Sequence, residues 1–531
     1  YQCDWSSDVC SSDLETLLTA EPGITITTFH SWFLQLLRRA PLDAGIVGDA
    51  TLSEETAALI TQAWERFAEQ TLRTPDSALA QALDHLFMQY GPDNTQRVLT
   101  NFLARRGDWW AYAYTGGGGG ADTDDDAAIA QALATQRVGM TVAPDEDVLG
   151  GLFDNPALKG QLSDFIEFLL RNTPTDQALG AALRESMAEP DAARWFERVW
   201  PVFLTTTGEI RVRSRKASKK QAERLGTDDE ARFLTIHQRV GERFLAAREA
   251  LAWQTGYRFN AAALRCGAAF AQTYQALKNE RRVIDYTDIE WHAHRLLSNS
   301  EHATYLICKL DARYRHVLLD EFQDTNPLQW LTLRQWFDAS AEADARPSVF
   351  VVGDPKQSIY RFRRAEARLF AQATDYLRVQ FNAVVLSQDE SRRCAPAVLD
   401  TVNRVFANEP AFEDYRTHQA HHIAMPGRIE VLPLIAKDES TQGEAIAWRD
   451  PFDTPLLEAE DSRRAREAAQ LAQGIMAMVD QWWIADENNE HSSGTHGRPV
   501  RYGDIMILVR RRTHLDVYEA ALRHEIGRAH V

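Results

Sequence analysis

The sequence is poor in cysteine, which limits the classes of protein to which it can belong. It has five cysteines in 531 residues, and no two of them form a Cys-x-x-Cys pair. A small disulfide-stapled scaffold is therefore excluded, and nothing indicates a zinc ribbon. We expect a protein of the reducing cytoplasm.

Long apolar runs and a secretory signal are missing as well. No run approaches the roughly 20 apolar residues of a membrane-spanning helix. Asp4 and Asp8 stand where a signal peptide would carry basic residues. We therefore expect no membrane partner. The 14 Trp and 23 Phe argue against intrinsic disorder, and a chain of this length holds about two to four domains.

Positive charge is scarce, because 58 Lys and Arg oppose 76 Asp and Glu and give a formal net charge of −18. Taken alone, this total disfavours a nucleic acid as the partner. A total averages over the whole surface, however, and a local set of arginines and aromatic rings can still bind DNA. The motifs therefore decide the class of partner.

The two ends of the chain look artificial. Residues 8–14 read DVCSSDL, and residues 526–531 read IGRAHV. One DNA sequence, translated on opposite strands, encodes both segments, and it resembles a sequencing-library adapter. We expect residues 1–14 and 525–531 to be artefactual extensions, which belong outside the fold. The residues between them would be a fragment of a longer protein.

Apolar residues recur at helical spacing from about residue 46 to 280. One stripe consists of Leu59, Ile60, Ala63, Trp64 and Phe67 and predicts an amphipathic helix. We expect this whole region to be mostly helical.

The pattern changes after about residue 280. Val317–Leu319 is a short apolar run that ends at Asp320, and Pro327 opens a helix. A second apolar run, Val349–Val352, ends at Gly353. Strand, helix and strand with acids at the carboxyl ends predict two buried strands of a parallel α/β sheet.

A second α/β domain is expected further along the chain. Its strands are predicted at 384–386, 429–432 and 505–509, and its helices at 397–406 and 463–481. The fold class is therefore α/β, with a large all-α segment.

A pair of carboxylates follows the first predicted strand, in the segment LLDEFQDTN at 318–326. Such a pair suits nucleotide hydrolysis. Asp320 can hold Mg²⁺ through oxygen, and Glu321 can orient or deprotonate the attacking water. Alone the pair is a weak signal, because acids often occupy turns after strands.

The segment GDPKQSIYRFR at 353–363 follows the second predicted strand. Gln357 could sense a γ-phosphate. Tyr360 and Phe362, interleaved with arginines such as Arg363, suit stacking on single-stranded bases. The alternative is a solvated basic turn whose two aromatic rings are buried in the core.

Together and in this order, the two segments resemble motifs II and III of the UvrD/Rep-like superfamily 1 DNA helicases. Three further segments support the resemblance. TTFHS at 27–31 resembles the family's DNA-approaching segment, DYTD at 285–288 resembles an acidic segment upstream of motif II, and 386–403 resembles motif IV. The resemblance covers nearly all of residues 24–523.

The resemblance implies RecA-like parallel-sheet P-loop NTPase motor domains with a large all-α insertion, and a 3′→5′ DNA translocase that uses ATP and Mg²⁺. Asp320 would hold Mg²⁺ and Glu321 would activate water. Gln357 and Arg393 would contact the γ-phosphate and report the ATP state to the DNA path.

The single strand of DNA would bind on two sides. Tyr360, Phe362 and Arg363 would stack on it and hold it, and Phe29 and His30 would contribute from the other side.

The resemblance also implies a division into domains. Residues 15–45 and 281–380 would form the two parts of the first motor domain, 46–280 the 1B-like helical insertion, and 381–524 the start of a 2A-like second motor domain.

Some family features are absent or altered. The chain has no Gly-Lys dipeptide, so the Walker A loop expected upstream of Thr27 is missing, and motifs V and VI would lie beyond residue 524. We expect the longer parent protein to hydrolyse ATP and this chain not to. Arg364 stands where the family usually has Gly, and Ser391 and Arg392 depart from motif IV.

The spacing favours one branch of the family. His30 and Asp320 are 290 positions apart, and a large helical insertion there resembles the RecB/AddA-type helicase–nuclease subunits of bacterial double-strand-break repair. That branch implies single- and double-stranded DNA as partners, a second subunit, a nuclease domain after the truncation and a nucleoid-associated location. The alternatives are a stand-alone UvrD/Rep-like repair helicase and an ATP-inactive, helicase-like DNA-binding scaffold.

Overall fold

The computed structural model describes residues 24–39, 50–53, 55–115, 124–212, 223–298, 300–342, 346–410, 415–436, 462–479, 481–485 and 497–529. The chain divides into two compact units, Tyr1–Tyr376 and Leu377–Val531. The expected N-terminal extension at 1–14 lies outside the described residues.

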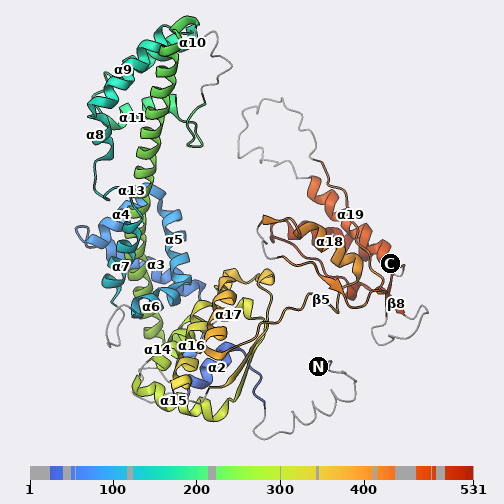
Figure 1. The fold of residues 1–531 in the computed structure, drawn as a ribbon. Coiled ribbons are helices and arrows are strands. Elements are labelled where there is room, and N and C mark those ends of the chain that lie inside the picture. Colours follow the sequence, from blue (N-terminus) through green and yellow to red (C-terminus); the bar gives the residue numbers. More distant parts are fainter. Residues whose placement is uncertain are drawn as a thin grey trace, which may run out of the picture. The chain divides into compact units, whose positions relative to one another are not determined.

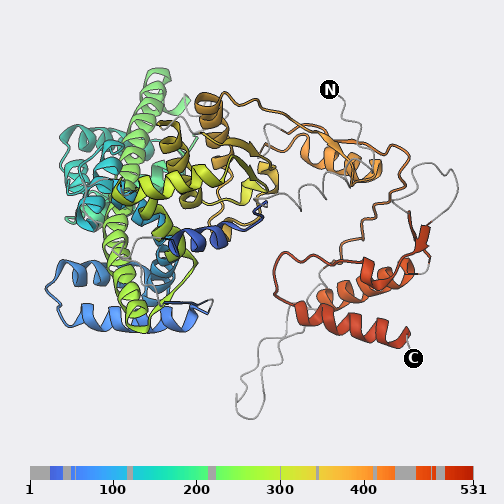
Figure 2. The same cartoon turned by 90° about the horizontal axis from the view of Figure 1, so that it is seen from below.

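A helix of 55 residues, α13 (Thr227–Arg281), organises the helical part of the first unit. Two groups of helices pack along it (Figures 1 and 2). One group lies along its C-terminal half and consists of α3 (Ala57–Leu72), α4 (Ala78–Tyr90), α5 (Pro92–Ala104), α6 (Arg106–Thr115) and α7 (Asp125–Val138). The other gathers at its N-terminal half and consists of α8 (Val148–Phe153), α9 (Pro156–Leu170), α10 (Pro174–Ser186) and α11 (Ala192–Phe203).

Separate apolar clusters hold the two groups to α13. Leu59, Ala63 and Phe67 of the stripe on α3 are buried against Phe270 and Tyr274 of α13. This confirms the predicted stripe. The second cluster buries aromatic rings from α9, α11 and α13, namely Phe165, Trp195, Phe203, Phe233 and Phe244. Because burial of such rings is a main source of folding free energy, each half of α13 has a core of its own.

The rest of the first unit is an α/β arrangement. Its helices are α2 (Phe29–Leu37), α14 (Tyr286–Ser298), α15 (Ser300–Arg313), α16 (Pro327–Glu342) and the first part of α17 (Arg368–Phe381), whose last residues belong to the second unit. Strands β1 (Thr51–Leu52) and β2 (Val283–Ile284) pair in parallel, as do β3 (His316–Leu319) and β4 (Ser348–Val351). The predicted strand–helix–strand unit is therefore confirmed, with α16 joining β3 to β4.

The predicted burial of β3 and β4 is wrong on one face. Leu318 is 73% exposed and Phe350 is 57% exposed. Successive side chains of a strand point to opposite faces of the sheet. Leu318 and Phe350 are paired in the register of the two strands, so their side chains lie on the same face. Only one face of this two-stranded sheet is therefore packed.

The second unit contains α18 (Pro396–Phe406), α19 (Ser462–Met478) and α20 (Leu515–Ala529). The first two confirm the predicted helices. Its strand pairs are short: β5 (Glu390–Ser391) is parallel to β6 (Gln419–Ala420), and β7 (Trp483–Ala485) is antiparallel to β8 (Gly497–Pro499).

The strands predicted at 384–386, 429–432 and 505–509 are wrong, because these residues have irregular structure. Their apolar side chains are largely exposed, with Val431 at 90% and Leu508 at 86%. A strand needs hydrogen bonds from a neighbouring strand, and an apolar run alone does not supply them.

Helix α20 continues to Ala529, so residues 525–529, which we expected outside the fold, are helical. No helix in the described part of the chain combines the length and apolarity that crossing a bilayer would take.

Candidate functional site

The carboxylate pair lies directly after the end of β3. Asp320 and Glu321 are both exposed there, and Oδ1 of Asp320 accepts a hydrogen bond from the backbone N–H of Glu321 at 2.9 Å. Glu321 has a φ of 49°, in the left-handed region. Non-glycine residues rarely adopt this conformation, and such strain collects at functional sites. The backbone therefore marks Glu321 independently of the sequence motif.

Gln323 joins the pair to the end of β4. Its side chain is buried; Nε2 donates to Oε2 of Glu321 at 2.5 Å, and Oε1 accepts the backbone N–H of Asp354 at 3.0 Å. A Cβ at Gly353 would come within 2.5 Å of Oε1 of Gln323. Glycine at that position thus lets the two strand ends approach, and Gln323 is a residue to which the sequence motif assigned no role.

Asp354 links this contact to Gln357. Nε2 of Gln357 donates to Oδ2 of Asp354 at 3.1 Å, and the backbone N–H of Lys356 donates to Oδ1 at 3.0 Å. Partial burial opposes ionisation of Asp354, but these hydrogen bonds and the charge of Lys356 outweigh it and lower the pKa of the carboxyl. The exposed Gln357 amide is therefore oriented by an ionised carboxylate.

The structure thus brings Asp320, Glu321 and Gln357 together at the adjacent carboxyl ends of β3 and β4. Arg393 belongs to the second unit. It is exposed there, in the turn before α18 in which Ser391 Oγ accepts the backbone N–H of Cys394 at 3.2 Å.

The aromatic residues after β4 are not a buried core. Phe362 is 78% exposed, and its ring centroid lies 5.7 Å from that of Tyr360, which is half-buried. This contradicts the reading of both rings as core residues. Arg363 lies in the same 3₁₀ turn, Arg361–Arg363, but its side chain is outside the described part of the structure.

Phe29 and His30 begin helix α2. Oγ1 of Thr28 caps this helix by accepting the backbone N–H of Ser31 at 3.3 Å. Both side chains are half-buried. The Phe29 ring centroid lies 6.0 Å from that of Phe33 in the core, so the base of α2 is held by packing as well as by its cap.

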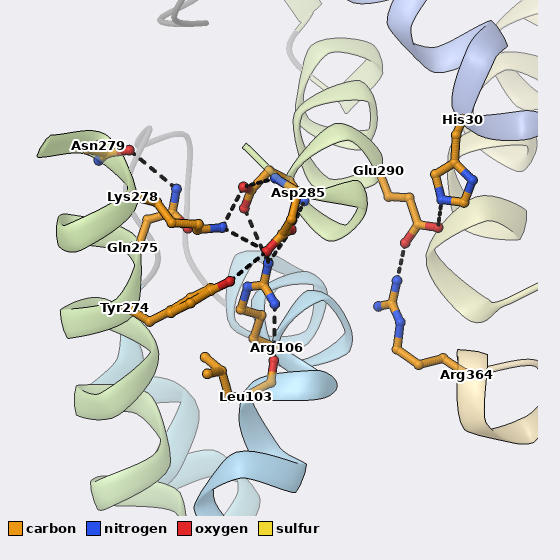
Figure 3. A network of polar contacts seen from close by, with 11 residues as sticks. His30, Leu103, Arg106, Tyr274, Gln275, Lys278, Asn279, Asp285, Glu290 and Arg364 are labelled. Carbon is orange, nitrogen blue, oxygen red and sulfur yellow. Dashed lines mark hydrogen bonds and ion pairs between the residues drawn. The ribbon is translucent and has the colours of Figure 1, made fainter. Parts of the chain in front are cut away.

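Sequence reasoning missed the carboxylate that anchors His30. His30 Nε2 lies 3.0 Å from Oε1 of Glu290 on α14, and Arg364 forms an ion pair with the other oxygen (Figure 3). Asn326 and Gln329 donate to Oε1 of Glu290 as well, at 2.7 and 2.8 Å. The signal in the sequence was a charged residue between two apolar ones, in the order Ile289, Glu290, Trp291.

The DYTD segment serves a second, separate network of buried charges. Arg106 donates to Asp285 at 2.5 Å, and Tyr274 donates to Asp285 at 3.1 Å (Figure 3). Lys278 donates to Asp288 at 2.5 Å. Burial opposes ionisation of Asp285, but the charges of Arg106 and Lys278 prevail and lower its pKa to about 2. This network ties the end of α13 to α6 and α14.

Within the described ranges, no group of three or more His, Cys, Asp or Glu side chains is arranged to hold a metal ion. Mg²⁺ does not require such a cage, since it commonly binds one or two carboxylates together with substrate phosphates and water. The exposed Asp320 carboxylate fits that type of ligation.

Comparison with known proteins gives a consistent set of similarities. A family model for the UvrD/REP helicase N-terminal domain matches residues 12–377. The A subunit of the ATP-dependent helicase/nuclease of Desulfitobacterium hafniense (strain DSM 10664 / DCB-2) is 28% identical over 284 residues, which cover 45% of this chain and 20% of that protein. The same type of subunit from Listeria monocytogenes serotype 4b (strain F2365) is 29% identical over 273 residues, 48% of this chain and 20% of its own length.

A third similar protein is the RecBCD enzyme subunit RecB of Escherichia coli (strain K12). It is 28% identical over 215 residues, which cover 40% of this chain and 17% of that protein. The chain therefore spans about a fifth of the length of the curated relatives that it matches.

Proposed function

The chain belongs to the UvrD/REP helicase family, and from that premise we propose that it is part of an ATP-dependent 3′→5′ DNA helicase. The observation that carries the proposal is the hydrogen-bonded series Glu321–Gln323–Asp354–Gln357. In this series the carboxylate pair after β3 and the side-chain amide of Gln357 after β4 lie at the adjacent carboxyl ends of two parallel strands. This is where α/β proteins bind their ligands.

The fold supports assignment to the P-loop NTPase class. In a RecA-like motor domain the parallel strands β3 and β4 would be two members of a larger sheet. Helices α3–α13 would then be the large all-α insertion between α2 and α14. The chain would comprise the first motor domain, from 15–45 and 281–380, the insertion at 46–280, and part of a second motor domain at 381–524.

In the nucleotide site, Asp320 would hold Mg²⁺, which when bound supplies positive charge to the ATP phosphates. Glu321 would accept the proton of the attacking water, and its orientation is fixed by Gln323. Gln357 would donate from its amide to the γ-phosphate, and Arg393 would also contact the γ-phosphate. These roles require the Glu321 carboxylate to be ionised and the Gln357 amide to be free to change partner.

In the DNA site, the exposed ring of Phe362 is a surface on which a base can stack. Tyr360 would extend this surface and Arg363 would add positive charge. Phe29 and His30 would contact the strand from α2.

The relatives support the helicase–nuclease branch over a stand-alone helicase, because their names are those of helicase/nuclease A subunits and of RecB from the RecBCD enzyme. The parent protein would then act on double-strand breaks in DNA together with a second subunit and would carry exonuclease activity. We place such an enzyme in the bacterial cytoplasm, on the nucleoid.

The test is ATP hydrolysis by the full-length gene product, with and without single-stranded DNA. We expect DNA to stimulate hydrolysis in the wild type, and Glu321→Gln to reduce the stimulated rate by about 10²- to 10⁴-fold, the contribution typical of a general base. Glu280→Gln is the matched control, because Glu280 forms an exposed ion pair with Arg66.

Two outcomes would contradict the proposal. A wild type without stimulation would point to an ATP-inactive scaffold, and a Glu321→Gln variant as active as the wild type would remove Glu321 from the mechanism. A nuclease assay on the same preparation distinguishes the helicase–nuclease subunit from a stand-alone helicase.

A further inference from the structure

One buried carboxylate accepts hydrogen bonds from three separate segments of the proposed motor domain. Glu290 on α14 contacts His30 at the start of α2 and Arg364 at the end of the turn after β4. Asn326 and Gln329, at the start of α16, complete the set. Figure 3 shows Glu290 between the side chains of His30 and Arg364.

The charges in this cluster bind each other strongly, because water is largely excluded. The side chain of Glu290 is 2% exposed and that of Arg364 is 11% exposed. Burial opposes ionisation of Glu290, but the hydrogen bond from His30 and the charge of Arg364 outweigh it and lower its pKa. An ionised carboxylate only accepts hydrogen bonds, so Nε2 of His30 must carry a proton. Nδ1 is then the ring nitrogen that this cluster does not use.

The backbone of Arg364 has a conformation that is unusual for an arginine. Arg364 has a φ of 69°, a conformation that favours glycine. An arginine here is explained by its side chain, which pairs with Glu290 and lies 3.6 Å from Oδ1 of Asp108.

Arg364 is directly connected to the proposed DNA-binding turn. Its backbone N–H donates to the carbonyl of Arg361 at 3.0 Å, and the N–H of Ala365 donates to the carbonyl of Tyr360 at 3.2 Å. Anchoring Arg364 therefore fixes the end of the turn that carries Phe362. The same carboxylate fixes His30, so one acceptor sets the positions of both sides of the DNA site.

We propose that Glu290 and Arg364 are positioning residues that hold His30 and the Tyr360–Phe362 turn as one preorganised surface for single-stranded DNA. The proposal rests on the proposed function and identifies what sets its affinity for DNA. Groups that are already fixed lose less conformational freedom on binding, so loss of either residue weakens binding without removing any group that touches DNA.

The test measures the affinity of the whole chain for fluorescein-labelled oligothymidylate of 20 nucleotides by fluorescence anisotropy. We expect Arg364→Gly and Glu290→Gln each to raise Kd about 10-fold, as expected when a hydrogen-bonded charged pair is lost. Arg364→Lys keeps the cation and is expected to recover part of the affinity. The double variant is expected to bind no more weakly than the weaker single variant, because both changes remove the same Glu290–Arg364 ion pair.

Arg282→Gly is the matched control. Arg282 has a φ of 52° and is the C-cap of α13, so this change relieves the same type of backbone strain in another segment of the chain. Its Kd is expected to equal that of the wild type. Thermal unfolding of every variant separates a change in affinity from a change in folding, and Arg364→Lys carries the test if Glu290→Gln does not fold.

The outcomes separate this inference from the proposed function. A wild-type chain that does not bind the oligonucleotide contradicts the DNA-binding role itself. If the wild type binds and both Arg364→Gly and Arg364→Lys bind as tightly as the wild type, the inference is overturned and the proposed function is not. Additive effects in the double variant also overturn it, since they would mean that Glu290 and Arg364 act independently.

Discussion

The amide of Gln323 donates to the carboxylate of Glu321 at 2.5 Å while its oxygen accepts the backbone N–H of Asp354 at 3.0 Å. One buried side chain thus connects the proposed general base to the segment that carries Gln357. Because Asp354 also accepts from the Gln357 amide, a ligand that draws Gln357 away alters a contact of Asp354, which in turn bonds Gln323. The site is a connected series rather than a set of separate groups.

The first prediction is that Gln323→Met slows DNA-stimulated ATP hydrolysis by the full-length gene product about 10- to 100-fold, the cost typical of a misplaced catalytic group. Methionine has a similar length but cannot donate to Glu321. We expect the change to appear in kcat rather than in KM, because Gln323 is not proposed to touch ATP. Steady-state kinetics measure both constants.

The matched control is Gln335→Met on α16. Nε2 of Gln335 donates to Ser298 at 2.6 Å, in a contact that does not involve Glu321, Asp354 or Gln357. Normal rates for Gln323→Met, or an equal loss in both variants, would contradict the positioning role of Gln323.

The sequence predicted those parts of the site that depend on local pattern. The apolar runs before Asp320 and Gly353 predicted β3 and β4, because strand geometry and turn chemistry are encoded within a few residues. The helical stripe that includes Phe67 was confirmed for the same reason.

Contacts between distant segments were not predictable. Glu290 meets His30 across 260 positions, and Arg106 meets Asp285 across 179. No periodicity encodes such pairs, since a charged residue within a helix is usually solvated. The strands expected at 429–432 and 505–509 failed for a related reason: strand formation depends on a partner that an apolar run does not specify.

The second prediction concerns the buried charges around the end of α13. Lys278 is fully buried and pairs with Asp285 and Asp288. We expect Lys278→Met to lower the free energy of unfolding by about 3–5 kcal/mol, because two buried carboxylates lose a cation. Chemical denaturation of the chain measures this.

Lys159→Met is the control, because it makes the same substitution in an ion pair that is exposed to solvent. Lys159 lies 3.9 Å from Asp154, and both side chains are substantially exposed. Exposed pairs contribute about 0–1 kcal/mol, so this variant is expected to unfold almost as the wild type does. A loss for Lys278→Met no larger than for Lys159→Met would show that the network does not stabilise the fold.

The third prediction is a pH dependence of stability that arises from His294. Burial lowers the pKa of this imidazole to about 4, and its buried Nδ1 has no hydrogen-bond partner in the described part of the structure. The unfolded chain therefore binds the proton more readily than the folded chain between about pH 6.5 and pH 4. Stability due to neutral His294 is complete above about pH 6.5 and falls by about 3 kcal/mol as the pH drops to 4.

His294→Phe should remove this part of the acid destabilisation and keep the aromatic packing against Trp291. Burial also lowers the pKa of His292, so some pH dependence of the same sign will remain. Unfolding of wild type and variant at pH 7 and pH 4.5 gives the difference, with the partly exposed His85→Phe as control. An unchanged pH dependence in His294→Phe would contradict the prediction.

The last prediction compares two glycines of the same helix. A Cβ at Gly267 of α13 would lie 2.6 Å from the ring of Phe102 on α5, whereas one at Gly256 would meet nothing within 4 Å. Alanine favours a helix over glycine by about 1 kcal/mol, so Gly256→Ala should stabilise the chain by up to that amount. Gly267→Ala gains the same propensity but forces Phe102 and α5 away from α13, and overpacking of this kind costs about 1–3 kcal/mol. Thermal unfolding should therefore shift the two midpoints in opposite directions. Equal upward shifts would show that α5 does not pack against α13 at Gly267.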